Sequence, residues 1–223
     1  MSKILLIETS SEVCSVGLAE NGEIKIVFEE KGGNIHASRA PQFVSQVLDL
    51  YDVDAVAVSS GPGSYTGLRI GVSLAKGIAY GKKIPLIAVP TLDAMASYIA
   101  SVFPLEDKAI VLPTVDARRR EIYTAAYNHK GMRLTDVKPV IIEPDSFNEF
   151  APAKLYIAGN AARKTFENVN YENKHIINVV PGVKNMVEIA CDKFARSAFE
   201  DVAYFEPFYL KQFLITKPKK KLL

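Results

Sequence analysis

The pattern of apolar and polar positions divides the chain into strands and helices that alternate in a regular order. Residues 3–10 (KILLIETS) form an apolar run that ends in small polar residues, as a buried strand does. A second apolar run follows, and Asn21-Gly22 separates it from a third, EIKIVFEE. Asn-Gly between two such runs is a strong β-hairpin signal. The first 30 residues therefore predict three consecutive strands that form a meander.

Helical periodicity begins after this meander. Apolar side chains recur on one face of a helix expected over about 36–51, at Phe43, Val44, Val47, Leu48 and Tyr51. The continuous apolar run AVAVS (55–59) predicts a strand covered by helices on both faces. A helix from about residue 67, a strand at 85–89 and a helix over about 91–101 complete this half.

A similar order recurs in the second half. Strands are expected at 109–116, 121–127 and 137–143, then a short helix at 144–150, a strand at 154–159 and a helix at 160–167, with a later helix over roughly 185–199. The order β-β-β-α-β-α thus appears twice, and each copy has the layout of a ribonuclease-H-like unit. The predicted fold is the two-lobed α/β architecture of the actin-like (ASKHA) proteins. We expect an N-terminal lobe at 1–104 and a smaller lobe at 105–223, whose C-terminal helix and basic tail pack back on the first lobe.

Composition excludes several classes of protein. The 223 residues carry a net charge of only +2, so the chain has no strong overall field toward nucleic acid or a membrane. The segment KPKKK, Lys217–Lys221, is either a solvated end or a tail that contacts phosphate. No apolar stretch approaches the roughly 20 residues that a membrane span needs. Cys14 and Cys191 follow no disulfide or metal spacing, so we expect a cytoplasmic protein with no membrane partner.

Two polar segments are candidates for phosphate binding. The first is the turn after the first strand, where an acidic residue is followed by three hydroxyl residues; the alternative is a polar hairpin turn capped by its own hydroxyls. The second is the glycine-rich segment GPGSYTG before a helix, which matches neither a Walker loop nor a Gly-x-Gly-x-x-Gly fingerprint. The candidates are Glu8, Thr9, Ser10, Ser11, Gly61, Gly63, Ser64 and Thr66.

The helix after the glycine-rich segment has small residues every four positions. They are Gly67, Gly71, Ala75 and Ala79, and Gly77 and Gly81 add a neighbouring pair. Glycine inside a helix costs up to about 1 kcal/mol against alanine, so we expect a close backbone approach to compensate. The approaching element is either part of the same lobe or a partner chain that docks on this ridge.

Evidence for catalysis is weak. His36, His129 and His175 are isolated, and no metal-binding spacing occurs. Ser64 lies in no nucleophile elbow. The segment DARRREIY, 116–123, forms either a salt-bridged solvated turn or a site for an acidic surface or RNA phosphate.

Three segments resemble the bacterial TsaB (YeaZ) family: ILLIETSSEVCSVGL, SSGPGSYTGLRIGVSLAKGIAYGKKIPLIAVPTLDAMA and DARRREIYTAAY. The stronger part spans about residues 4–127, and EPFYL near the end is consistent with it. The resemblance implies the ASKHA fold and a non-catalytic partner of TsaD. With the ATPase TsaE, these proteins make N6-threonylcarbamoyladenosine (t6A) beside the anticodon of tRNA.

The resemblance also identifies what is missing. TsaD carries an N-H-x-E-x-H metal motif after the strand that corresponds to 85–89. Thr91 and Met95 stand here in place of its two histidines, and Asp93 is the only acidic residue. A hydroxyl and a thioether do not replace two imidazoles. We therefore expect no catalytic residue, no metal and no cofactor, with nucleotide binding at a subunit interface left open.

In the family, two helices of the N-terminal lobe dock TsaD. Carried over, they are about 36–51 and 67–80, and the implied interface residues are His36, Phe43, Val47, Tyr51, Gly67, Gly71, Ala75 and Ala79. The expected partners are TsaD, TsaE and, through the complex, tRNA, with a homodimer when the chain is isolated. The alternatives are an active ATP-dependent kinase or transferase of the same fold and, remotely, a peptidase.

Overall fold

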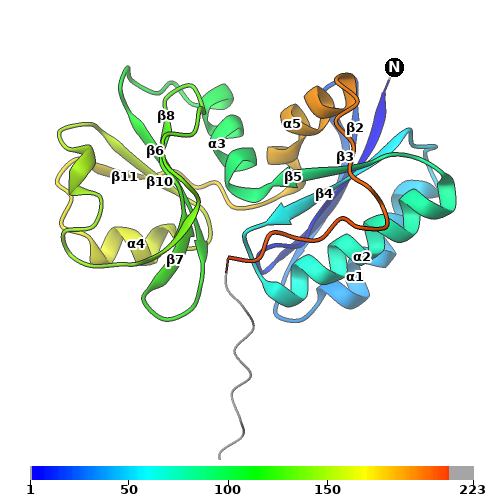
Figure 1. The fold of residues 1–223 in the computed structure, drawn as a ribbon, viewed down its shortest axis with the longest axis horizontal. Coiled ribbons are helices and arrows are strands. Elements are labelled where there is room, and N and C mark those ends of the chain that lie inside the picture. The colour runs from blue at the N-terminus through cyan, green and yellow to red at the C-terminus, as the bar shows by residue number, and fades with distance from the viewer. Residues whose placement is uncertain (1, 211–223) are drawn as a thin grey trace, which may run out of the picture.

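The computed structural model describes residues 2–210 and shows two lobes, each built on a β-sheet (Figure 1). In lobe one the sheet has the order β3-β2-β1-β4-β5. Its strands are β1 (Lys3–Glu8), β2 (Val13–Glu20), β3 (Glu23–Lys31), β4 (Ala55–Gly61) and β5 (Leu86–Pro90). β1, β4 and β5 are parallel, while β2 and β3 continue the sheet antiparallel. The carboxyl ends of the three parallel strands therefore meet at one edge.

Lobe two has a second mixed sheet with the order β11-β10-β6-β7-β9, and β8 pairs with β6. Its strands are β6 (Ile110–Asp116), β7 (Glu121–Thr124), β8 (Tyr127–Asn128), β9 (Lys138–Ile141), β10 (Leu155–Ala158) and β11 (Lys174–Ile176). The prediction of a two-lobed α/β fold is confirmed. Three details differ: the strand expected at 121–127 is split into β7 and β8, the helix expected at 144–150 is a short 3-10 turn, η1 (Asn148–Phe150), and β11 was not predicted.

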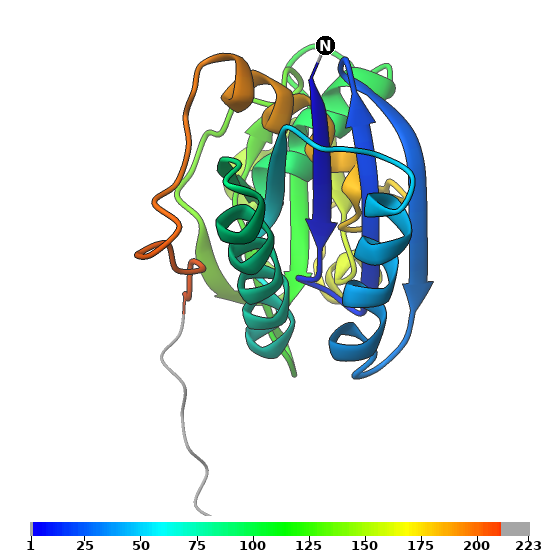
Figure 2. The same cartoon turned by 90° about the vertical axis from the view of Figure 1, so that its right-hand side faces the viewer.

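Helices cover both sheets, and two of them, α3 (Thr91–Val102) and α5 (Val183–Ala195), pack on the lobe formed by the other half of the sequence. The other helices are α1 (His36–Leu48), α2 (Tyr65–Lys82) and α4 (Ala162–Asn168). Figure 2 shows α1 and α2 side by side over one face of the lobe-one sheet. The other face is covered by α5, through Val183, Met186 and Ala190. In return, α3 packs Leu92 and Met95 against the lobe-two sheet. Each half of the sequence therefore contributes a helix to the core of the other lobe.

The chain after α5 returns along lobe one. Glu200 pairs with Leu86, the ammonium of Lys76 donates to the carbonyls of Ala203 and Phe205, and the Phe208 N–H donates to the carbonyl of Ser60. Lys217–Lys221, the predicted basic tail, lies outside the described residues. None of the helices within residues 2–210 combines the length and the apolar character that a membrane span requires.

Candidate functional site

The turn between β1 and β2 packs directly on the glycine-rich segment that begins α2. The Thr9 hydroxyl donates to the carbonyl of Gly67 at 2.8 Å, and the Ser64 N–H donates to the carbonyl of Ser10 at 2.7 Å. Ser64 also caps α2, because its Oγ accepts from the N–H of Gly67 at 3.2 Å. The two segments predicted to bind phosphate are therefore brought together, and two hydrogen bonds join them.

Glycine is required where these segments touch. A Cβ on Gly67 would lie 2.0 Å from the Thr9 carbonyl oxygen, and one on Gly63 would lie 2.5 Å from the Ser10 carbonyl oxygen. A Cβ on Gly71 would lie 2.2 Å from Thr9 Oγ1. The glycines thus allow α2 to approach the backbone of its own lobe.

This packing corrects the phosphate-binding prediction for the β1–β2 turn. Glu8, Thr9, Ser10 and Ser11 are each at most 4% exposed, so an anion has no access to them. Gly61 and Gly63 are likewise occupied, since the carbonyl of Phe208 lies against Gly61 and that of Ser10 against Gly63. Ser64 and Thr66 remain exposed, and phosphate binding by these two residues stays a prediction.

Glu8 is a buried carboxyl group with no described cation beside it. Its Oε1 accepts the Ser10 N–H at 2.6 Å. Burial raises the pKa of Glu8 above its ordinary value of 4.5, and the hydrogen bonds from Ser10, Ser59 and Thr9 oppose this shift only in part. The folded protein therefore disfavours the charged form of this side chain.

This shift predicts a pH-dependent effect of Glu8→Gln. Because the folded pKa of Glu8 is raised, the contribution of this side chain to stability is complete below pH 4.5 and is lost as the pH rises through the folded pKa. Glutamine keeps an oxygen that accepts the Ser10 N–H but carries no charge. Denaturant unfolding of both proteins from pH 4 to pH 8 should show a stability gain of Glu8→Gln that grows with pH. A gain that is constant or shrinks over this range would contradict the argument.

The small-residue ridge of α2 faces inward, which corrects the prediction that it docks a partner. Gly67, Gly71, Ala75 and Ala79 are all buried. They lie beside Leu68 and Val72 on the face that packs on the lobe-one sheet and the β1–β2 turn. The alternative that the ridge packs within its own lobe is therefore the correct one.

The residues carried over to the partner interface from the helix expected at 36–51 also face the core, although α1 ends at Leu48 and Tyr51 lies beyond it. His36 and Val47 are buried, and Phe43 and Tyr51 are half-buried against the core of lobe one. The apolar periodicity located these two helices correctly, but it marks the face of each helix that stabilises the lobe. The outward faces of the two helices are the faces left open to a partner.

The outward faces of α1 and α2 form one surface, which we call the helix-pair face (Figure 2). Tyr80, near the C-terminal end of α2, is 82% exposed, and a Cβ on Gly77 or Gly81 would meet no atom within 4 Å. Neither helix contains an acidic residue, and their only basic residues are Arg39, Arg69, Lys76 and Lys82. The exposed residues of this face include Gln42, Ser45, Ser73, Gly77, Tyr80 and Gly81. The sequence signal for it was the second glycine pair, which packs against nothing in its own lobe.

Two of the positions that correspond to the TsaD metal motif are buried in the protein. Thr91 and Met95 are buried on one side of α3, and Met95 belongs to the apolar core between α3 and the lobe-two sheet. Asp93, two residues from each, points away and accepts the Tyr127 hydroxyl at 2.5 Å. Among residues 2–210, no three His, Cys, Asp or Glu side chains are grouped to hold a metal ion.

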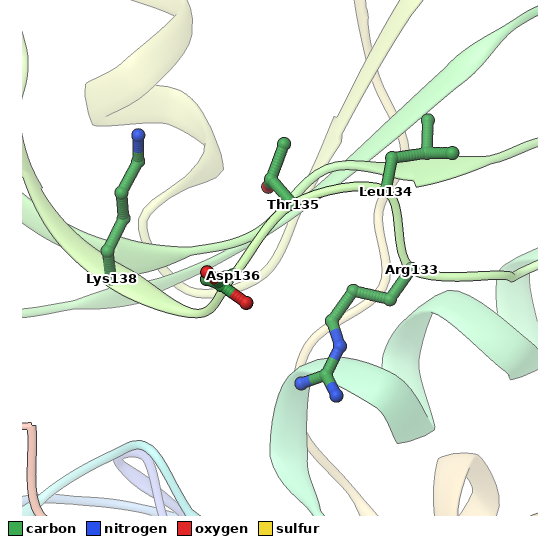
Figure 3. Close-up of a pocket in the computed structure, with 5 residues that line it drawn as sticks. All are labelled: Arg133, Leu134, Thr135, Asp136 and Lys138. Atoms are coloured by element: carbon green, nitrogen blue, oxygen red, sulfur yellow. The ribbon is translucent and has the colours of Figure 1, made fainter.

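An open depression on lobe two is lined by Arg133, Leu134, Thr135, Asp136 and Lys138 (Figure 3). Arg133 and Lys138 point in opposite directions there, so their charges do not converge on a common point. Arg133 lies 3.9 Å from Asp93. This depression shows no arrangement of side chains that would hold a small ligand.

Comparison with known proteins supports the resemblance seen in the sequence. The family model described as "TsaD: tRNA N6-adenosine threonylcarbamoyltransferase" matches residues 35–222. The tRNA threonylcarbamoyladenosine biosynthesis protein TsaB of Escherichia coli (strain K12) is 29% identical over 222 residues, which cover 94% of both chains. The chain belongs to the TsaB (YeaZ) family. The TsaB protein of Haemophilus influenzae is 28% identical, with 93% of both chains covered.

The solved structures agree with this family. YeaZ from Pseudomonas aeruginosa superposes with a TM-score of 0.79 at 27% sequence identity, covering 94% of this chain and 100% of that one. A second Pseudomonas aeruginosa structure, described as an uncharacterized protein with similarity to peptidase YEAZ, gives a TM-score of 0.81 at 27% identity. The predicted membership of the TsaB family and the predicted fold are therefore both confirmed.

Proposed function

We propose that this chain is the non-catalytic scaffold subunit of a tRNA N6-adenosine threonylcarbamoyltransferase complex. In this role it docks the catalytic subunit TsaD and helps to recruit the ATPase TsaE for t6A modification of tRNA beside the anticodon. The observation that carries the proposal is similarity over 94% of both chains to a protein named for tRNA threonylcarbamoyladenosine biosynthesis.

The helix-pair face is the proposed docking surface for TsaD. Central parts of protein interfaces are poor in charge and rich in tyrosine, which describes the surface around Ser73, Gly77 and Tyr80. Exposed glycines at 77 and 81 lower the stability of α2 by up to about 1 kcal/mol each against alanine. A partner helix lying against the bare backbone at these positions would offset this loss, since it can approach more closely there than over larger side chains.

The same face supports the proposal of a homodimer in the absence of TsaD. In a two-fold symmetric dimer, the same surface of each copy contacts the other copy. The helix-pair face of one chain would then pack against the helix-pair face of a second chain. The homodimer and the complex with TsaD would then compete for the helix-pair face.

An active kinase or transferase is a weaker proposal for this chain. The turn that would bind phosphates in such an enzyme, Glu8–Ser11, is buried and bonded to the start of α2. At the position of the TsaD metal motif, Thr91 and Met95 pack in the protein core. These residues are therefore part of the packed structure, whereas a catalytic role would require them to be exposed.

The proposal is tested by reconstitution. The purified chain is mixed with TsaD and TsaE from the same organism. An unmodified tRNA transcript is then incubated with this mixture, ATP and threonylcarbamoyl adenylate, and the t6A formed in the transcript is measured. We expect the chain to co-elute with TsaD in size exclusion and t6A to form only when it is present. A wild-type chain that never co-elutes with TsaD would count against the scaffold role, and ATP turnover by the chain alone would favour the enzyme.

A further inference from the structure

The turn between β6 and β7 presents three consecutive arginines, Arg118, Arg119 and Arg120, all exposed. The turn is closed by two backbone hydrogen bonds, from Ala117 N–H to the Glu121 carbonyl and from Glu121 N–H to the Arg118 carbonyl, both 3.1 Å long. It connects two strands of the lobe-two sheet at the end where β6 finishes (Figure 1). The three guanidinium groups therefore project from a defined hairpin end.

Two of these arginines hold an unfavourable backbone conformation. Arg118 has φ = 72° and Arg119 has φ = 51°, both in the left-handed region. Asn and Gly are the residues that hairpin turns favour at such positions, because Gly has no Cβ and the short Asn side chain can form local hydrogen bonds, whereas longer side chains are strained there. Strain of this kind costs on the order of 1–3 kcal/mol per residue and is concentrated at functional sites.

The turn is held in place without using the arginine side chains. Lys164, on α4, donates to the carbonyls of Arg119 and Glu121 at 3.1 and 2.8 Å and forms an ion pair with Asp116. Asp116 in turn accepts the backbone N–H of Arg118 at 3.1 Å. The carboxylate of Asp116 is thus already paired with a lysine.

The guanidinium groups themselves remain available. Among residues 2–210, none of the three forms an ion pair with a carboxylate. The Arg120 side chain makes a 3.4 Å hydrogen bond to Asn168, while Arg118 and Arg119 direct theirs toward solvent at the end of the hairpin. An arginine fork fits the oxygens of a phosphate group in a bidentate geometry, and adjacent arginines suit adjacent phosphates.

We propose that the β6–β7 arginine turn binds the phosphate backbone of tRNA. This inference rests on the proposed function, which makes tRNA the substrate of the complex. Three consecutive exposed arginines suit the regularly spaced phosphates of an RNA backbone, and the proposed function supplies tRNA as that polyanion.

The test is the binding of a fluorescently labelled, unmodified tRNA transcript to the complex of this chain with TsaD, measured by anisotropy at several KCl concentrations. The variant is Arg118→Gln/Arg119→Gln. Its matched control is Lys108→Gln/Lys130→Gln, which removes the same charge from exposed residues at the opposite end of β6. Lys108 also has a positive φ of 66°, so the control, like the arginine variant, changes a residue in the left-handed region.

We expect the arginine variant to weaken tRNA binding about tenfold and to reduce the salt slope by one to two, because each lost phosphate contact releases about one counterion fewer. The lysine control should stay within about twofold of wild type. Unchanged binding by the arginine variant, or an equal loss in both variants, would overturn the proposal. Loss of TsaD co-elution in the arginine variant would instead assign the turn to a protein partner.

The same titration with the chain alone at low salt separates this proposal from the proposed function. If the wild-type chain does not co-elute with TsaD but binds tRNA through the arginine turn, the scaffold role fails and the RNA site stands. If the complex forms and binds tRNA equally well without the two arginines, the RNA site fails and the scaffold role stands.

Discussion

Replacing Gly67 with alanine is expected to lower the free energy of unfolding by about 3 kcal/mol, at the upper end of the range for overpacked sites. The new Cβ would lie 2.0 Å from the carbonyl oxygen of Thr9, and this oxygen belongs to backbone that cannot move away without disturbing the β1–β2 turn. The loss should appear in denaturant unfolding followed by circular dichroism.

Gly77→Ala is the matched control, since it makes the same change in the same helix. Its Cβ would meet no atom within 4 Å. Alanine is the better helix former, so this variant should be more stable than wild type by about 0.5–1 kcal/mol. If both variants lost stability equally, or if Gly67→Ala were neutral, the glycines of the 61–71 segment would not serve the packing described here.

Gly77→Leu is expected to weaken association with TsaD at least about a hundredfold while leaving the isolated chain folded. A leucine at this exposed position has room in the monomer but would separate a partner helix from the α2 backbone. A hundredfold loss corresponds to about 2.7 kcal/mol of binding free energy. Isothermal titration of the chain with TsaD measures it.

Ala195→Leu provides the control for a leucine added to an exposed helix position. Ala195 ends α5, which covers the opposite face of the lobe-one sheet from α1 and α2. This variant should bind TsaD as wild type does. Normal binding by Gly77→Leu, or an equal loss in both variants, would place the docking surface elsewhere. Gly71→Leu would be uninformative, because its side chain would collide with Thr9 inside the lobe.

Local signals in the sequence were sufficient for most of the fold. Asn21 and Gly22 have φ values of 55° and 85°, as the hairpin between β2 and β3 requires. The apolar run at 55–59 is β4, whose residues are all buried, as expected for a strand with helices on both faces. In lobe two the signals were weaker, because β8 and β11 have only two and three residues and show no alternation to detect.

The inward face of α2 could not be read from periodicity. This helix carries small and apolar residues on more than one side, so Gly67 and Gly77 looked equally suited to a partner. What distinguishes them is the carbonyl of Thr9, 58 residues earlier in the chain, which reaches Gly67 only after β1 and β4 have paired. The exchange of α3 and α5 between the lobes is likewise a long-range feature with no local signal.

The central claim is that the outward faces of α1 and α2 receive the catalytic subunit, and hydrogen–deuterium exchange tests it most directly. Exchange is measured on the full chain alone and in complex with TsaD. The account predicts slower exchange in peptides covering His36–Leu48 and Tyr65–Lys82, with Val183–Ala195 unchanged. A stable complex in which those two helices exchange as fast as in the free chain, with new protection confined to α5 or lobe two, would contradict it.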